Sequence, residues 1–256
     1  TWNNNFRWDS NFTLSHNKNK IKELVRDYVH PETGELINKD RLDVGGLGKA
    51  RFILKEGGTL GDLYTQSDLK RDDNGMVDID PTGIVAIENN LPDIKLGSVF
   101  PKANLAWSNH FSWKGISLSA LFTARIGGIV YSATEAAMDQ YGVSERSALA
   151  RDNGGVLVNN RTLVDAQNYY TTIGSESGLP QYYTYNATNV RLQEASIGYL
   201  IPRKWLGNVC DIQVSVIGRN LWMIYNKAPF DPESVATTDN YYQGIDSVSY
   251  THLTLP

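Results

Sequence analysis

The sequence predicts an all-β protein of the antiparallel transmembrane β-barrel class. Between Ile116 and Tyr131, apolar and polar side chains alternate for longer than a soluble strand normally runs. Alternation with a period of two is typical of a strand with one apolar face and one polar face. Ordinary strands have about 3–10 residues, whereas a tilted strand crossing a bilayer needs about 9–11 in the hydrocarbon alone. A second observation is the segregation of short turns and long loops between such strands, which is typical of outer-membrane barrels.

The composition fits this class and excludes several others. The 256 residues include 20% charged residues and carry a formal net charge of −4, which gives no sign of a nucleic-acid-binding surface. No run of about 20 apolar residues is present, so no transmembrane helix is predicted. Cys210 is the only cysteine, which excludes an intrachain disulfide and a thiolate metal cluster. The 14 Tyr and 6 Trp suit membrane-interface girdles or sugar-stacking surfaces equally well.

The first hundred residues contain four predicted strands. The first one places Phe6, Trp8, Phe12 and Leu14 on its apolar face, and the polar cluster His16–Lys20 predicts a tight turn after it. A charged, irregular segment without regular structure is expected over residues 22–47. The other three strands are predicted at Ala50–Glu56, Leu60–Leu69 and Met76–Ile79.

The clearest hairpin joins two long amphipathic strands. Alternation over Ala103–Trp113 is followed by Lys114-Gly115 and then by the strand that starts at Ile116. A two-residue connection joins antiparallel strands and cannot join parallel ones. Gly127-Gly128, near the end of the second strand, predicts a bend or bulge.

The second half contains two more strands and a long polar loop. Residues 132–188 form this loop, in which Ala133–Gln140 is predicted to be a short helix. In the strand Val190–Leu200 the apolar phase slips at its upstream end, at Val190 and Leu192, which predicts a bulge or a change of environment there. After a short connection at Ile201–Asn208, the last strand has an apolar face formed by Cys210, Ile212, Val214 and Val216. Tight connections are thus expected after Ser15, Trp113 and Leu200, and long ones after Glu23, Tyr131 and Tyr225.

Several motifs, in their order and spacing, resemble SusC/RagA-type TonB-dependent outer-membrane transporters. Residues 190–199 read Val-Arg-Leu-Gln-Glu-Ala-Ser-Ile-Gly-Tyr and are followed by Ile201-Pro202. The remaining matching segments are Asn17–Ile21, Trp113–Leu118, Gly218-Arg219-Asn220-Leu221 and Phe230-Asp231-Pro232-Glu233. The resemblance covers about residues 1–246.

The resemblance implies a barrel of about 22 strands with an N-terminal plug domain. It also implies import of glycans, oligosaccharides or peptides with a SusD-like surface lipoprotein as a lid, energised through the plug by the TonB complex. Residues 1–246 would be the C-terminal portion of the barrel, an incomplete wall without the plug, in the outer membrane of a Gram-negative, Bacteroidetes-like bacterium. The missing initiator Met and signal peptide are likewise expected of a fragment. Residues 247–256 resemble translated adapter read-through and are expected to be a non-native tail; a genuine short strand at residues 250–255 is the alternative.

Two groups of residues are candidates for function. Loop aromatics could stack on sugar rings or pack against the lid lipoprotein, or they could hold the loop together or lie at the membrane interface. The loop aromatics are Tyr169, Tyr170, Tyr182, Tyr183 and Tyr185. The second group, Arg125, Glu194 and Arg219, falls on the polar phase of its strands and is predicted to face the barrel lumen. They could form salt bridges to the plug or shape the passage, and a structural ion-pair role is favoured.

No enzyme, cofactor or metal site is predicted. The four histidines are scattered, and Gly45–Lys49 fails the spacing of a phosphate-binding loop. The acidic segment Asp72–Asp80 lacks the residue order of an EF-hand, so a solvated turn is favoured over a calcium site. The main alternative to a transporter is a soluble β-sandwich carbohydrate-binding module. A glycan-cleaving enzyme is a third hypothesis, for which no catalytic constellation is found.

Overall fold

The computed structural model describes residues 6–207, 209–233 and 244–246. These residues fall into two compact units, each formed by several segments of the chain. The sheet unit consists of Thr1–Lys18, Pro101–Gly128 and Ala187–Asp231. The core unit consists of Asn19–Phe100, Ile129–Asn186 and Pro232–Pro256. The residues of the predicted tail, 247–256, lie outside the described residues.

Most of the regular structure is β-strand. The strands are β1 (Phe6–Ser15), β2 (Val25–Val29), β3 (Leu36–Lys39), β4 (Arg41–Leu47), β5 (Ala50–Lys55), β6 (Asp62–Thr65), β7 (Asp68–Leu69), β8 (Ile87–Glu88), β9 (Ile94–Ser98), β10 (Ala103–Trp113), β11 (Ile116–Ile126), β12 (Ile129–Ser132), β13 (Val156–Val158), β14 (Thr162–Val164), β15 (Thr184–Asn186), β16 (Asn189–Ile201), β17 (Ile212–Asn226) and β18 (Ile245–Asp246). The helices are α1 (Ala133–Gln140), α2 (Glu145–Asp152) and α3 (Ala166–Gly174), with short 3-10 turns η1 (Ser175–Ser177), η2 (Pro180–Tyr182) and η3 (Arg203–Leu206). None of the helices described is long and apolar enough to cross a membrane.

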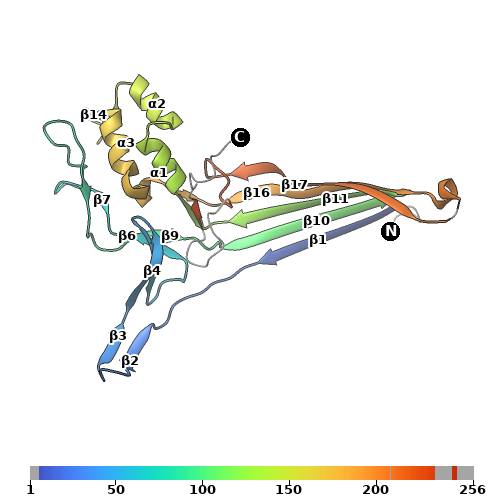
Figure 1. Ribbon diagram of the computed structural model, residues 1–256, viewed down its shortest axis with the longest axis horizontal. Helices are drawn as coiled ribbons and strands as arrows, with labels where there is room; N and C mark the ends of the chain where they lie inside the picture. The colour runs from blue at the N-terminus through green and yellow to red at the C-terminus, as the bar shows by residue number, and fades with distance from the viewer. Residues whose placement is uncertain (1–5, 208, 234–243, 247–256) are drawn as a thin grey trace. The chain divides into compact units, whose positions relative to one another are not determined.

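The sheet unit is one antiparallel sheet of long strands in the order β1-β10-β11-β16-β17. These strands run side by side as the long arrows of Figure 1. The hairpin predicted at Lys114-Gly115 is confirmed, because Trp113 pairs with Ile116 directly across the turn. Both turn residues have a positive φ, 48° for Lys114 and 86° for Gly115. Such turns match the right-handed twist of the two strands.

One face of this sheet is apolar and exposed. Side chains in register form rows across all five strands, one of which contains Trp8, Phe111, Leu118, Ile197 and Val216. A parallel row contains Phe12, Trp107, Phe122, Leu192 and Trp222. Many of these side chains are exposed, among them Phe12 at 64% and Val216 at 68%. Among the described residues of the sheet unit, the only buried apolar ones are Ala187 and Ala228, so the sheet has no hydrophobic core of its own.

Two polar side chains interrupt the apolar face, and both are hydrogen-bonded. Ser10 and Asn109 lie opposite each other between the two large rows. The indole N–H of Trp107 donates to Ser10 Oγ at 3.0 Å, and that of Trp8 donates to Asn109 Oδ1 at 3.2 Å. Since an unpaired polar group away from water costs several kcal/mol, about 2–7 by common reference scales, this pairing makes both residues compatible with an apolar surface.

The turn predicted at His16–Lys20 is wrong. β1 pairs with β10, which follows some ninety residues later, so a long connection leaves the end of β1. The polar segment instead leads into the core unit, which begins at Asn19: Asn19 Oδ1 accepts from Leu60 N at 3.1 Å, and Ile21 N donates to Gly58 O at 2.9 Å. With this correction, the long connections β1–β10 and β11–β16 share one end of the sheet. The short turns β10–β11 and β16–β17 share the other end.

The bulge predicted upstream in β16 is confirmed. The register shifts between Leu121 and Phe122 of β11, and again between Leu192 and Glu194 of β16. Opposite this point in β17, Asn220 adopts a left-handed conformation with φ of 50°. Its Oδ1 accepts a hydrogen bond from Gln193 Nε2 at 2.9 Å. Asn tolerates this conformation better than other non-glycine residues, which explains its presence on the apolar phase of the strand.

The core unit contains the hydrophobic core of the described chain. Its largest fully buried side chains include Phe52, Leu63, Tyr131, Ile173 and Tyr183. Four of them come from β5, β6, β12 and helix α3, and Tyr183 lies between η2 and β15. Helix α3 packs against α1 and α2 (Figure 1). This unit thus has the packing of an ordinary water-soluble domain.

The sequence predicted the core unit only in part. The strand at Ala50–Lys55 and helix α1 are confirmed. The segment expected to be irregular, residues 22–47, contains β2, β3 and β4, in which Arg41 is half-buried and the other charged side chains occupy exposed strand positions. The strand expected over Leu60–Leu69 is broken into β6 and β7, and Met76–Ile79 forms only isolated bridges. The loop 132–188 contains α2, α3 and the hairpin β13–β14 besides the predicted helix.

Candidate functional site

A buried carboxylate organises the tyrosine-rich part of the core unit. The Asp139 side chain, on helix α1, is fully buried. It accepts hydrogen bonds from Ser144 Oγ at 2.5 Å and from Tyr183 Oη at 2.9 Å, and it forms an ion pair with Arg146. Ser144 is also the N-cap of α2 and accepts from Ser147 N at 3.1 Å. One carboxylate therefore connects α1, the start of α2 and the segment that carries Tyr183.

Arg146 extends this cluster to further aromatic rings. Its guanidinium lies 4.8 Å from the ring centroid of Tyr183 and 6.0 Å from that of Tyr170. These distances are within the range of cation–π contacts. Tyr169 packs edge-on against Tyr170, with 5.4 Å between centroids. The Tyr185 hydroxyl donates to Glu135 on α1.

The structure thus brings the five predicted loop tyrosines into one unit and gives them different exposures. Tyr183 is fully buried, so its side chain offers no surface to a ligand or a lid, and it contacts Asp139 and Arg146. Tyr169, Tyr170, Tyr182 and Tyr185 are half-buried and keep part of each ring accessible. A contact role is available to these four residues only.

The hydroxyls of this cluster are protonated at neutral pH. Burial raises the pKa of Tyr182 to about 12. Burial, followed by the nearby Asp139 carboxylate, raises the pKa of Tyr183 far above its ordinary value. Burial and a hydrogen bond to Glu135 likewise raise the pKa of Tyr185. These groups act as hydrogen-bond donors and aromatic surfaces, because a phenolate nucleophile would need a lowered pKa.

The predicted lumen-facing residues share the polar face of the sheet unit. Arg219 Nε and Glu194 Oε2 form an ion pair at 3.0 Å across β16 and β17. The arginine side chain is 76% exposed in this structure, so in water this pair would contribute little stability. Arg125 is half-buried and pairs in register with Asn104 and Asn189. The three residues do not meet at a single point.

A second ion pair on the sheet unit was not anticipated from the sequence. The Arg191 side chain, only 6% exposed, donates to both carboxylate oxygens of Asp231, at 2.7 and 3.3 Å. Such two-point pairs are geometrically specific. Arg191 Nε also donates to Asn189 Oδ1 at 3.4 Å. The pair joins the segment after β17 to the first residues of β16. It gives a physical role to the two matching sequence motifs that contain Arg191 and Asp231.

Hairpin turns account for the segments that superficially suggest phosphate or calcium binding. Lys49 lies in the β4–β5 turn, and its Nζ donates to Glu176 Oε2 at 2.8 Å. Asp72 Oδ1 accepts from the backbone N–H groups of Asn74 and Met76, both at 2.9 Å. Asp80 Oδ1 does the same for Thr82 and Ile84. Within the described ranges, no three His, Cys, Asp or Glu side chains are grouped so that they could hold a metal ion.

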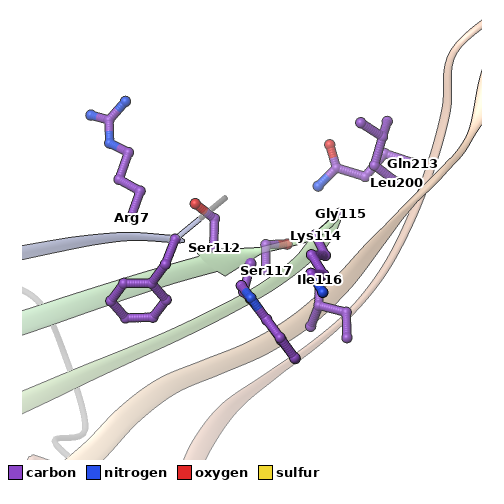
Figure 2. A pocket seen from close by; sticks show the side chains of 10 residues that line it. Arg7, Ser112, Lys114, Gly115, Ile116, Ser117, Leu200 and Gln213 are labelled. Carbon is purple, nitrogen blue, oxygen red and sulfur yellow. The ribbon is translucent and has the colours of Figure 1, made fainter. Parts of the chain in front are cut away.

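A hollow of about 530 Å³, lined by both polar and apolar residues, lies at the turn end of the sheet unit (Figure 2). Arg7, Ser112 and Ser117 project on the polar side of the β10–β11 hairpin, and Gln213 approaches from β17. Figure 2 shows Ile116 on the opposite side of the same hairpin. The hollow is open and has no constellation of acid, base and nucleophile, so its geometry offers positioning of polar groups rather than chemistry.

Comparisons with known proteins relate the chain to one class of outer-membrane protein. No family model matches the sequence. The chain is 25% identical over 279 residues to TonB-dependent receptor P3 of Formosa agariphila, in an alignment covering 97% of the chain and 26% of that protein. Its fold is similar to the RagAB peptide transporter, with a TM-score of 0.55 and 17% identity over 88% of the chain and 24% of that structure. The RagAB peptide importer in its open-open state gives a TM-score of 0.54 and 17% identity over 94% and 26%.

The chain spans about a quarter of the length of each of these proteins. Similarity over nearly the whole chain agrees with the ordered motifs and with the long antiparallel strands. The chain is therefore similar in sequence to a TonB-dependent receptor and similar in fold to the RagAB structures.

Proposed function

We propose that the chain forms part of the wall and outer loops of an outer-membrane active transporter. The sheet unit supplies membrane-spanning strands of the C-terminal portion of the barrel, and the core unit is an elaborated set of extracellular loops. The observation that carries this proposal is the exposed apolar face of the sheet, whose strands have 10 to 15 residues. A contiguous apolar surface of this kind marks a membrane or partner interface. The segregation of short turns and long connections supports the membrane.

The substrate class that we propose is an oligosaccharide or a short peptide. A peptide is supported by the titles of the two similar structures, a peptide transporter and a peptide importer. A glycan is supported by the half-buried tyrosines of the core unit, since aromatic rings stack on sugars. A SusD-like surface lipoprotein would cap the outer loops, and the TonB complex would supply energy through a plug domain belonging to the complete protein.

A catalytic role is not proposed. The related proteins are described as receptors and transporters. A soluble carbohydrate-binding module is disfavoured, because such a module would bury the large apolar side chains that the sheet unit exposes.

Expression of the complete gene in a Gram-negative host tests the location, and uptake assays test the activity. We expect recovery in the outer-membrane fraction, with extraction only by detergent, whereas recovery in the soluble fraction would contradict the proposal. In a strain from which the transporter gene is deleted, uptake of labelled oligosaccharides or peptides should be lost. Cells that keep the transporter gene but lack a functional TonB complex should show the same loss. Loss of one substrate class alone identifies the cargo.

A further inference from the structure

An apolar hollow lies on the apolar face of the sheet, at the turn end of the β10–β11 hairpin. It has a volume of about 470 Å³ and is lined by five apolar side chains. The lining residues are Phe6, Phe111, Trp113, Ile116 and Leu118. Hollows of this size and lining are typical of sites for small apolar or amphipathic ligands. Flexible hydrocarbon fits this shape better than a rigid polar molecule would.

A cation is held at the turn end of this hollow. The ammonium of Lys114 lies 5.1 Å from the ring centroid of Trp113, one of the lining residues. Trp113 belongs to the apolar phase of β10, so the contact brings the Lys114 ammonium next to an aromatic ring of the apolar face. Arg7, by contrast, lies on the polar side (Figure 2) and pairs with Asp9 at 2.7 Å. Lys114 itself lines the hollow of Figure 2, and Trp113 lines both hollows, so the Lys114 ammonium neighbours the apolar hollow through the Trp113 ring.

The neighbouring turn adds positive charge and another aromatic side chain. Leu200 N donates to Gly115 O at 2.7 Å, which places the end of β16 beside the β10–β11 turn. The connection that follows contains Lys204 and Trp205 and no acidic residue from 202 to 207. Trp205 is 73% exposed. The turn end of the sheet thus combines cations with exposed indole rings, a combination favoured where lipid headgroups meet hydrocarbon.

We propose that this hollow is a binding site for a phospholipid of the periplasmic leaflet. The lipid's phosphodiester pairs with the Lys114 ammonium, and one acyl chain lies in the hollow against Trp113, Ile116 and Leu118. The inference rests on the proposed function, because it takes the short turns to be the periplasmic end of membrane-spanning strands. The charge of Lys114 selects an anionic headgroup, and the hollow selects an acyl chain.

The test is a titration of the complete transporter, purified in mild detergent, with palmitoyl-oleoyl phosphatidylglycerol, followed by native mass spectrometry. Lys114→Gln should bind this lipid about fivefold more weakly, the contribution typical of one lysine near an anionic membrane surface. Lys102→Gln is the matched control, because it removes an exposed cation beside the start of β10, at the opposite end of the sheet. Its affinity should equal that of the wild type. Retention of the compact electrophoretic form before heating verifies that both variants fold.

Two results would overturn the site. One is equal lipid affinity of Lys114→Gln and wild type, or equal weakening by Lys102→Gln, which would indicate non-specific charge attraction. The other is displacement of the lipid by glycerol 3-phosphate at equal concentration, which would indicate a phosphate site without an acyl component. Failure of the proposed function is distinguishable from either result, because the protein would then be absent from the outer-membrane fraction from which it is purified.

Discussion

Asp139 is a buried charge whose surroundings supply both compensation and hydrogen bonds. Isolated buried carboxylates are costly, and they persist where a cation and donors surround them. Asp139 has both kinds of partner: the cation is the Arg146 guanidinium, and the donors are the hydroxyls of Ser144 and Tyr183. The cluster joins residues from two helices and a later segment, so its main effect is on the shape of the core unit.

Removing this carboxylate should destabilise the core unit. Asp139→Ala leaves Arg146 without its partner and two hydroxyls without an acceptor. We expect a loss of about 2–3 kcal/mol, below the 3–5 typical of a broken fully buried pair because the Arg146 side chain is 38% exposed. Limited proteolysis of the complete transporter under increasing urea measures the effect on the loops. Asp152→Asn, on the exposed end of α2, is the matched control, and equal protease sensitivity of the two variants would contradict the role assigned to Asp139.

The sequence could predict individual residues only where the information was local. The five tyrosines were recognisable as a group, but the burial of Tyr183 depends on Asp139, 44 positions away. The pair of Arg191 with Asp231 spans 40 positions. The matching motifs located both residues, but sequence spacing alone does not show that their side chains meet. Long-range ion pairs of this kind require the fold to be known.

Among the structural elements, the long strands were the most predictable. Apolar and polar residues alternate within each strand, so β1, β10, β11, β16 and β17 could all be found from the sequence. The last of them, β17, extends further than expected. The strand paired with β1 could not be found, because pairing depends on where a long connection returns. Helices α2 and α3 were missed although local signals exist: Ser144 and Asp165 are N-caps that accept from Ser147 N and Asn168 N. Their polar sequences obscured the helical period.

Asn220 provides a test of the bulge. Asn220→Val should destabilise the sheet by about 1–2 kcal/mol, because a β-branched residue is strained at a φ of 50° and the hydrogen bond from Gln193 is lost. Asn220→Gly keeps the conformation accessible and should cost less. The temperature at which the complete barrel loses its compact electrophoretic form measures both variants. A Val variant as stable as the Gly variant would show that backbone strain at this position is unimportant.

At the scale of the whole molecule, the two units differ in where they place their large apolar side chains. The core unit buries Phe52, Leu63 and Tyr131 as a water-soluble domain does, whereas the sheet unit exposes Phe12, Trp222 and Val216. A five-stranded sheet with no buried large apolar side chain among its described residues cannot derive its stability from a core of its own. Lipid against the apolar face would cover its exposed side chains, and neighbouring strands of a closed barrel would pair with both edge strands of the sheet.

The central claim is that the apolar face of the sheet contacts lipid and the polar face contacts water. A spin-label scan along β11, from Ile116 to Ile126, tests it in the complete transporter reconstituted in bilayers, in a background in which Cys210 and any other native cysteine are replaced by Ser. Labels at Leu118, Ala120 and Phe122 should collide with oxygen, which concentrates in hydrocarbon. Labels at Ser117, Ser119 and Thr123 should collide with a water-soluble nickel complex. A period-two alternation between the two relaxants is the predicted result, and uniform access of the nickel complex along the strand would contradict the account.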